Sequence, residues 1–171
     1  RLKLATQNAD QLVTAQNAVF DIAQRTRTAL STTVDLYARI ERSTRNIGLN
    51  QATVLQLTET ISKTSTLSGG GPGVENALVQ FGQLLSAGDL SAAAQELNSI
   101  QEQAPRLAQA LVDGLKELGY TGTGSLKKLI SEGGVPLNDL LRALLSQTGK
   151  IDDEFNELPP SISGALTQIR N

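Results

Sequence analysis

The stretch SGGGPGVENALVQFGQLLSAGDLSAAAQELNSIQEQAPRLAQALVDGL, residues 68–115, decides the fold. It opens with a run of glycines and a proline that cannot continue a helix, because glycine is flexible and proline lacks a backbone donor. After this break, apolar residues recur at the spacing of one helical face. We expect helices over 74–86 and 90–103, and a third that opens at Pro105 and ends at Gly119. Their apolar stripes are Val74, Leu78, Phe81 and Leu85, then Leu90, Ala94, Leu97 and Ile100, then Leu107, Leu111, Leu115 and Leu118.

The residues before this stretch predict three more helices, over 4–30, 32–46 and 51–67. Ser31 and Asn50 are expected N-caps, since their side-chain oxygens can accept from free backbone N–H groups. Gly48 is an expected helix stop, because glycine adopts the left-handed conformation at little cost. The first stripe comprises Leu12, Val19, Ala23 and Leu30, widened by Val13, Phe20 and Ile22, and the next two comprise Val34, Tyr37, Ile40, Val54, Leu57 and Ile61.

The residues after this stretch predict a short helix over 126–131 and a more apolar one that starts at Pro136. Thr148 and Gly149 interrupt that pattern, and a last helix is expected over 163–170. The whole chain is therefore expected to be all-α, a compact module of short and medium helices with a long first helix. The apolar residues of the C-terminal helices are Leu137, Leu140, Leu141, Leu144, Leu145, Ile151 and Phe155.

The glycine and proline content suggests a division of the chain into four regions. We expect a helical hairpin region over 1–67, a Gly/Pro-rich link over 68–73, a core helical domain over 74–158 and the start of a further helical segment over 159–171. The sequence begins with Arg1 and contains no Met. We therefore expect it to be a piece of a longer protein.

The composition excludes several chemistries. The 171 residues include no Cys and no His, which leaves no thiolate or imidazole for a zinc site, haem ligation or a Ser-His-Asp triad. A net charge of −2 does not predict specific nucleic-acid binding, and no apolar run approaches a membrane span. GTGSLKK (residues 122–128) lacks P-loop spacing. The acidic cluster Asp152, Asp153, Glu154 and Glu157 is interpreted as a solvated helix face. We expect no cofactor, no metal and no enzymatic activity.

One motif carries more than periodicity. Residues 68–115 resemble the tape measure domain of tailed bacteriophages and prophages, whose pattern joins L-x-Q-x-x-Q-x-L-x-x-G to N-S-I-x-E-Q-A-P-R-L. The flanks over 35–63 and 124–145 resemble the family's neighbouring helices. The sequence departs from the family pattern at 91–94, in the extra glycines near 69–71 and in a longer link at 116–125. The matching residues are Leu78, Gln80, Gln83, Leu85, Gly88, Leu90, Glu96, Asn98, Ser99, Ile100, Glu102, Gln103, Ala104, Pro105, Arg106 and Leu107.

The resemblance implies a structural role in the virion. Tape measure proteins set tail length while the tail tube assembles around them, occupy the tail lumen after assembly in the host cytoplasm, and leave ahead of the DNA. The implied partners are the tail tube protein, tail assembly chaperones, baseplate or tail-tip proteins, further copies of the chain, and the host membrane on ejection. The alternative is a helical protein–protein interaction module of a secretion or adaptor protein. Expected contact residues are Gln80, Gln83, Glu96, Asn98, Ser99, Glu102, Pro105 and Arg106.

Overall fold

The computed structural model describes residues 9–87, 89–122, 124–160 and 167–171, and these residues form helices and connecting turns with no strand. This confirms the all-α expectation. The helices are α2 (Ala9–Thr26), α3 (Leu30–Thr44), α4 (Gln51–Leu67), α5 (Pro72–Ser86), α6 (Ala94–Gln103), α7 (Pro105–Glu117), α8 (Leu126–Gly133), α9 (Leu137–Ser146) and α10 (Thr148–Asn156), with short 3₁₀ turns η1 (Arg45–Ile47) and η2 (Leu90–Ala92).

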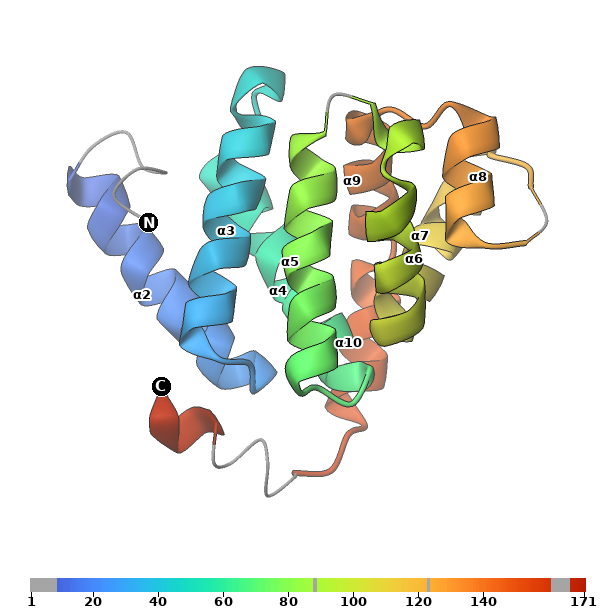
Figure 1. Cartoon of the computed structure of the whole chain (residues 1–171). Coiled ribbons are helices and arrows are strands. Elements are labelled where there is room, and N and C mark those ends of the chain that lie inside the picture. Colours follow the sequence, from blue (N-terminus) through green and yellow to red (C-terminus); the bar gives the residue numbers. More distant parts are fainter. Residues whose placement is uncertain (1–8, 88, 123, 161–166) are drawn as a thin grey trace.

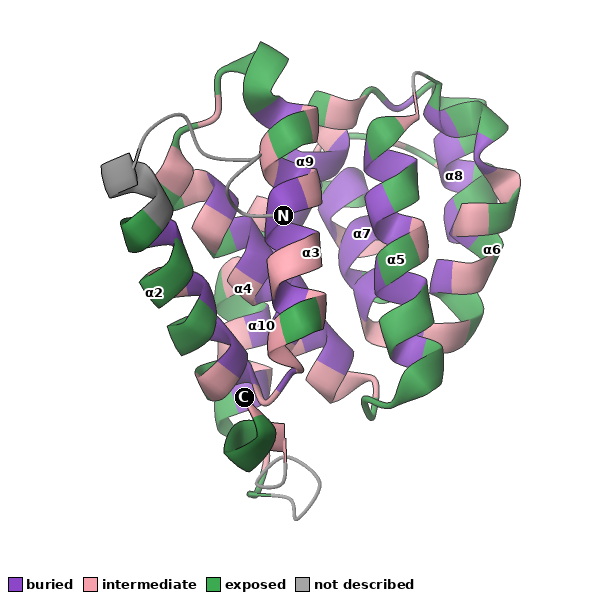
Figure 2. Cartoon of the chain, turned by 60° about the vertical axis from the view of Figure 1, so that its left-hand side comes forward, coloured by how far each residue is buried: buried purple, intermediate pink, exposed green. Residues whose placement is uncertain are grey.

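The helices pack in two layers (Figure 1). In the front layer of that view, α2, α3, α5, α6 and α8 follow one another across the molecule. Behind them lie α4, α7, α9 and α10. The central element is α4, which contacts α2, α3 and α5 on one side and α7, α9 and α10 on the other. One hydrophobic core therefore runs through the described helices, and buried residues line the inner faces of both layers (Figure 2). The expected division into regions stays a prediction.

The central helix is unusual in burying hydroxyl side chains together with Val54, Leu57 and Ile61. Thr58 donates to the carbonyl oxygen of Val54 (2.8 Å), and Thr64 donates to that of Ile61 (2.7 Å). A buried hydroxyl without a partner costs about 1–3 kcal/mol, and these bonds avoid that cost. Thus α4 crosses the core without being strongly amphipathic.

Most helix boundaries agree with the local sequence. Asn50 caps α4 by accepting from the Thr53 N–H (2.8 Å), and Gly48 ends the preceding turn at φ 72°. Pro72 and Pro105 open α5 and α7 at their first turns. Pro136 directly precedes α9, and the expected interruption near Thr148 is a break at Gln147 between α9 and α10.

Three expectations about the first helices were wrong. The first helix ends at Thr26 rather than continuing to residue 30, because Arg27 takes a left-handed conformation (φ 59°) and the Thr28 N–H turns back to the Ala23 carbonyl. Ser31 is therefore not an N-cap but an exposed residue inside α3, whose preceding residue is Ala29. Val13 and Phe20 do not widen the buried stripe either, since they are 57% and 40% exposed. Residues 4–8 and 163–166 of the expected helices lie outside the described residues.

The expected helix over 90–103 is divided. Asp89 accepts from the Ser91 N–H (2.9 Å) and shapes the 3₁₀ turn η2, so that α6 begins only at Ala94. Ala93 is buried in place of Ala94, which is partly exposed. The turn places Leu90 in the core next to α8.

Candidate functional site

Four of the eight expected contact residues come together in an open polar groove between α5 and α6. These helices lie side by side in the front layer (Figure 1). Gln80 lies on α5, and Asn98, Ser99 and Glu102 lie on α6, where Glu102 is four and three residues after the other two and therefore neighbours both. The groove has a volume of about 550 Å³ and is lined by Asn76, Gln80, Ala94, Gln95, Asn98, Ser99, Glu102 and Gln103. We call it the α5–α6 groove.

The α5–α6 groove is lined mainly by amide side chains, together with one hydroxyl (Ser99) and one carboxylate (Glu102). Asn76 Nδ2 donates to Gln103 Oε1 (3.2 Å) and links the two helices across one end. The Ser99 Oγ is buried and has no hydrogen-bond partner in the described part of the chain. A buried polar group in this state is a candidate for contact with a partner. Such a groove can hydrogen-bond a polypeptide through its side-chain amides.

The other four expected contact residues lie apart from the groove. Gln83 is exposed farther along α5, Glu96 is half-buried on α6, and Pro105 occupies the first turn of α7. Arg106 instead faces α10, where its Nε and Nη2 (3.1 Å) both donate to the Glu154 carboxylate. Its backbone N–H donates to the Ser68 Oγ (3.2 Å), which ties the start of α7 to the end of α4. This geometry gives Arg106 a role in packing, whether or not it also contacts a partner.

The acidic cluster is not a uniformly solvated face, and that interpretation was wrong for two of its members. Besides the Arg106–Glu154 pair, Asp152 accepts from Lys63 of α4 (2.7 Å). The cause is the position of α10 in the rear layer, against α4 and beside α7. Asp153 and Glu157 are exposed, as expected.

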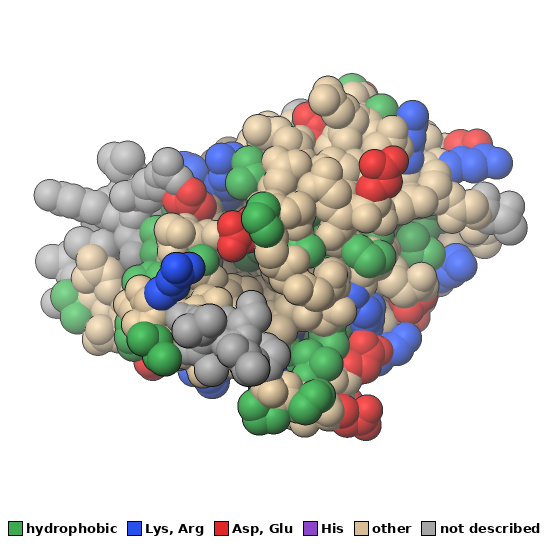
Figure 3. All heavy atoms as spheres, turned by 60° about the horizontal axis from the view of Figure 1, so that its bottom comes forward, with side chains coloured by type: hydrophobic (Ala, Val, Ile, Leu, Met, Phe, Trp, Pro, Cys, Tyr) green, Lys and Arg blue, Asp and Glu red, His purple; other side chains and the backbone are tan. Residues whose placement is uncertain are grey.

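A second cavity lies at the corner where the α2–α3 turn, the end of α4 and the start of α5 meet. It has a volume of about 290 Å³. We call it the corner cavity. Figure 3 shows this end of the molecule, where uncharged side chains and backbone dominate the surface and charged groups are scattered. The lining residues are Arg27, Thr28, Ala29, Thr32, Ser65, Thr66, Gly69, Gly70, Gly71, Glu75, Leu158, Pro159 and Thr167.

Glycines make one wall of the corner cavity. Gly69, Gly70 and Gly71 all have positive φ (95°, 64° and 88°), a conformation that other residues rarely adopt. The Gly69 and Gly70 N–H groups turn back to the Thr66 and Ser65 carbonyls and close the end of α4. The sequence predicted this segment as a connector and missed the cavity. The sequence feature that could have indicated the cavity is the threonine-rich turn over residues 26–33, which faces these glycines.

No cluster of potential metal ligands occurs in the described residues, and no helix among them is long and apolar enough to cross a membrane.

A family model described as "tape measure protein" matches residues 1–171. The chain belongs to the tape measure protein family. This membership confirms the resemblance found in residues 68–115 and makes the chain a structural component of a phage tail. Comparisons with curated proteins and with solved structures found no match.

The structure of this tape measure chain shows which helices carry the two halves of the family pattern. The L-x-Q-x-x-Q-x-L half forms α5, and the N-S-I-x-E-Q-A-P-R-L half forms α6 and the first turn of α7. Leu85, Ile100 and Leu107 of the pattern are buried in the core. Gln80, Asn98 and Glu102 remain accessible at the α5–α6 groove, which Ser99 also lines with its Oγ buried.

Proposed function

We propose that this chain is part of a protein that sets tail length while the tail tube assembles around it. Assembly begins in the host cytoplasm, the protein then occupies the tail lumen, and it leaves ahead of the DNA on infection. The observation that carries this proposal is the match of the tape measure family model to residues 1–171.

Within that role, we infer that this module is a folded head rather than the measuring rod. Its longest described helix, α2, has 18 residues, and at 1.5 Å per residue it spans only about 27 Å. The helices fold back on one another in two layers. Additional residues in such a fold enlarge the hydrophobic core and do not lengthen the molecule in proportion to their number. The measuring length then resides in an extended helical part of the protein outside this module.

The head docks an assembly partner in the α5–α6 groove. A tail assembly chaperone is the preferred occupant, because the groove offers the amides of Gln80 and Asn98 and the carboxylate of Glu102 to a polypeptide. The tail tube protein, baseplate or tail-tip proteins, further copies of the chain and, on ejection, the host membrane are the remaining proposed contacts.

Tail length in phage that carry altered versions of the full gene tests the measuring role. Deletions in the extended helical part are expected to shorten tails by about 1.5 Å per residue, as a helix in the tube predicts. Loss-of-contact substitutions in this module are expected to reduce the number of tails while leaving the length of completed tails unchanged. Tails of unchanged length after the helical deletions would disprove the measuring role.

Co-purification with the tail assembly chaperones tests the groove. The double variant Gln80→Ala/Asn98→Ala removes two polar groups from facing helices and is expected to weaken chaperone binding at least tenfold. Gln109→Ala on α7 is the control, because Gln109 is an exposed amide that neither lines the groove nor belongs to the expected contact residues. Equal retention of the chaperone by both variants would exclude the α5–α6 groove as its site.

A further inference from the structure

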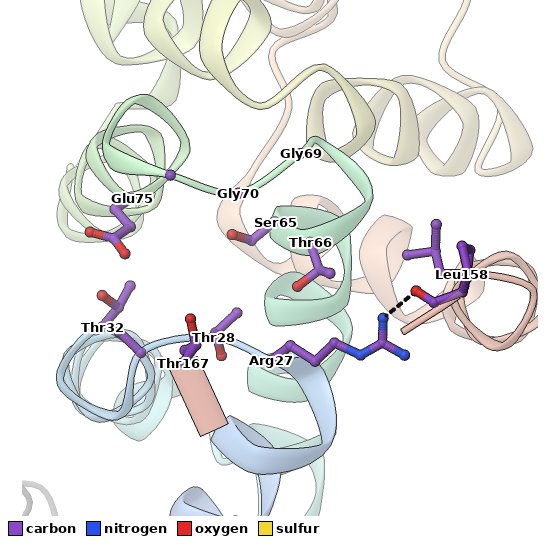
Figure 4. Close-up of a pocket in the computed structure, with 13 residues that line it drawn as sticks. Arg27, Thr28, Thr32, Ser65, Thr66, Gly69, Gly70, Glu75, Leu158 and Thr167 are labelled. Carbon is purple, nitrogen blue, oxygen red and sulfur yellow. Dashed lines mark hydrogen bonds between the residues drawn. The ribbon is translucent and has the colours of Figure 1, made fainter. Parts of the chain in front are cut away.

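The corner cavity contains three oxygen-bearing side chains with no hydrogen bond or ion pair in the described structure: Thr32 of α3, Ser65 of α4 and Glu75 of α5. Ser65 as a whole is 4% exposed, and its hydroxyl lines the cavity without a hydrogen-bond partner among the described residues. In Figure 4 the oxygens of all three point toward the same space, beneath the turn of Gly69 and Gly70. Three separate helices therefore direct free acceptors into one cavity.

The other polar groups of the cavity are already engaged. Thr28 Oγ1 bonds to Thr26 (2.8 Å) and Thr33 (2.9 Å), and Thr66 Oγ1 donates to the Thr26 carbonyl (2.6 Å). Arg27 points away from Glu75 and donates to the Pro159 carbonyl (3.0 Å; Figure 4). Its guanidinium carbon also lies 5.4 Å from the Phe155 ring centroid. The side-chain groups left for a ligand are one carboxylate and two hydroxyls, a set that favours a cation over an anion.

We propose that the corner cavity binds a primary ammonium group carried by a lysine side chain of a tail-assembly partner. An ammonium has three N–H donors and no acceptor, which matches the carboxylate of Glu75 and the hydroxyls of Thr32 and Ser65. A volume of about 290 Å³ accommodates the four-carbon stem as well as the charged end. Leu158 and Pro159 supply apolar wall for the stem.

The assignment of the lysine to a tail-assembly partner rests on the proposed function, whereas the recognition of an ammonium group does not. Recognition of the ammonium depends on Thr32, Ser65 and Glu75 and not on the α5–α6 groove. Titration with a small lysine derivative therefore tests the cavity separately from the docking role, and a failure of chaperone binding at the groove would leave this result unchanged.

The experiment is a titration of the chain with Nα-acetyl-lysine-methylamide, followed by backbone amide NMR. Saturable shifts are expected at Thr32, Ser65 and Glu75 with a Kd of about 1–10 mM, the weak affinity of a small ligand. The uncharged norleucine analogue is expected to cause none. Glu75→Gln is expected to weaken binding at least tenfold. Glu96→Gln is the matched control, because Glu96 also lies in the first turn of its helix but outside the cavity, and it is expected to leave binding unchanged.

Thermal melting, a second set of substitutions and the diamine putrescine serve as controls for the titration. Because Glu75 also favours the start of α5, thermal melting accompanies the titration. If Glu75→Gln is unfolded, the double variant Thr32→Val/Ser65→Ala replaces it and is expected to weaken binding several-fold. Absence of shifts with the lysine derivative would overturn the proposal. Saturable binding of putrescine without binding of the lysine derivative would assign the cavity to a free diamine and overturn the partner assignment.

Discussion

Gly114 shows how one missing side chain sets the distance between two helices. It is buried on α7, and a Cβ atom built there would overlap the carbonyl oxygen and main chain of Ala143 on α9. Backbone cannot move aside as a flexible side chain can. We expect Gly114→Ala to lower the free energy of unfolding by about 3 kcal/mol, at the upper end of overpacking effects. Urea unfolding measures this change.

Gly149→Ala provides the control for that substitution. Gly149 lies in α10, and a Cβ added there meets nothing within 4 Å. Alanine is about 1 kcal/mol better than glycine inside a helix, so this variant is expected to be equally or more stable. A Gly114→Ala variant as stable as Gly149→Ala would show that the contact with Ala143 does not limit the approach of α7 to α9.

Arg106 and Glu154 form an ion pair whose side chains are 14% and 35% exposed. Removal of either group leaves the other without its bidentate partner. We expect Arg106→Ala and Glu154→Gln each to destabilise the fold by about 1–3 kcal/mol. A double-mutant cycle is expected to give a coupling of about 1–2 kcal/mol. Zero coupling would show that the two side chains do not stabilise each other.

The same pair of variants also tests the sequence-based hypothesis that Arg106 contacts a partner. That hypothesis predicts a larger loss of tail assembly in Arg106→Ala than in Glu154→Gln at matched stability. Equal assembly yields would leave Arg106 with a packing role alone.

At the scale of the element, α3 receives its cap from far along the chain. Asn171 Oδ1 accepts from the Leu30 N–H, and Asn171 Nδ2 donates to the Thr28 carbonyl, both at 2.8 Å. Gln24 and Gln168 exchange side-chain to backbone hydrogen bonds close by (3.1 and 2.8 Å). We expect Asn171→Ala to cost about 1 kcal/mol, as loss of a cap does, and to speed amide exchange at Leu30 and Ser31. The exposed Arg170→Ala is the control, and equal exchange in both variants would contradict capping by Asn171.

This cap also explains which element boundaries could be predicted from the sequence. Asn50, Ser125, Pro72 and Pro105 act within their own turns, so residue type and spacing suffice to place the helix starts. The start of α3 depends on a residue 141 positions away, which no local pattern reveals. Likewise Arg27 takes a conformation typical of glycine.

The same distinction applies to the candidate sites. Family resemblance pointed to Gln80 and Asn98 before the structure placed them in one groove. The corner cavity escaped prediction because Thr32, Ser65 and Glu75 belong to three helices and form no motif.

At the scale of the whole molecule, charged side chains join helices that are distant in sequence. Arg25 of α2 and Lys63 of α4 both contact Glu59 (2.9 and 3.0 Å), Lys63 continues to Asp152 of α10, and Lys150 of α10 contacts Asp113 of α7 (3.1 Å). The Lys63–Asp152 and Lys150–Asp113 contacts lie within the rear layer, and the Arg25–Glu59 contact joins α2 of the front layer to α4. The fold therefore depends on charge more than a wholly apolar core would.

This dependence predicts how stability changes with pH. Burial opposes ionisation of Glu59, but hydrogen bonds from Arg25 and Lys63 outweigh it and hold its pKa below the ordinary 4.5. The pKa of Asp113 is likewise lowered, because bonds from Gln109 and Lys150 outweigh its partial burial. A carboxylate with a lowered folded-state pKa stabilises the fold above its unfolded pKa, and this stabilisation is lost as pH falls through the folded value. We therefore expect the urea midpoint to be constant near neutrality and to fall below about pH 4.5.

At alkaline pH the stability is expected to change in the opposite direction, because the relevant group is a lysine with a raised pKa. Burial disfavours the charged form of Lys63, yet bonds to Asp152 and Glu59 outweigh it and raise its pKa above 10.5. Its contribution is present below that value and is lost only as pH rises through the raised pKa. Glu59→Gln removes the shared partner of Arg25 and Lys63, so it is expected to cost on the order of 1 kcal/mol at pH 7 and to flatten the acid limb. An acid limb of unchanged steepness in Glu59→Gln would place the acid sensitivity in other carboxylates and contradict the central role of the Arg25–Glu59–Lys63 contacts.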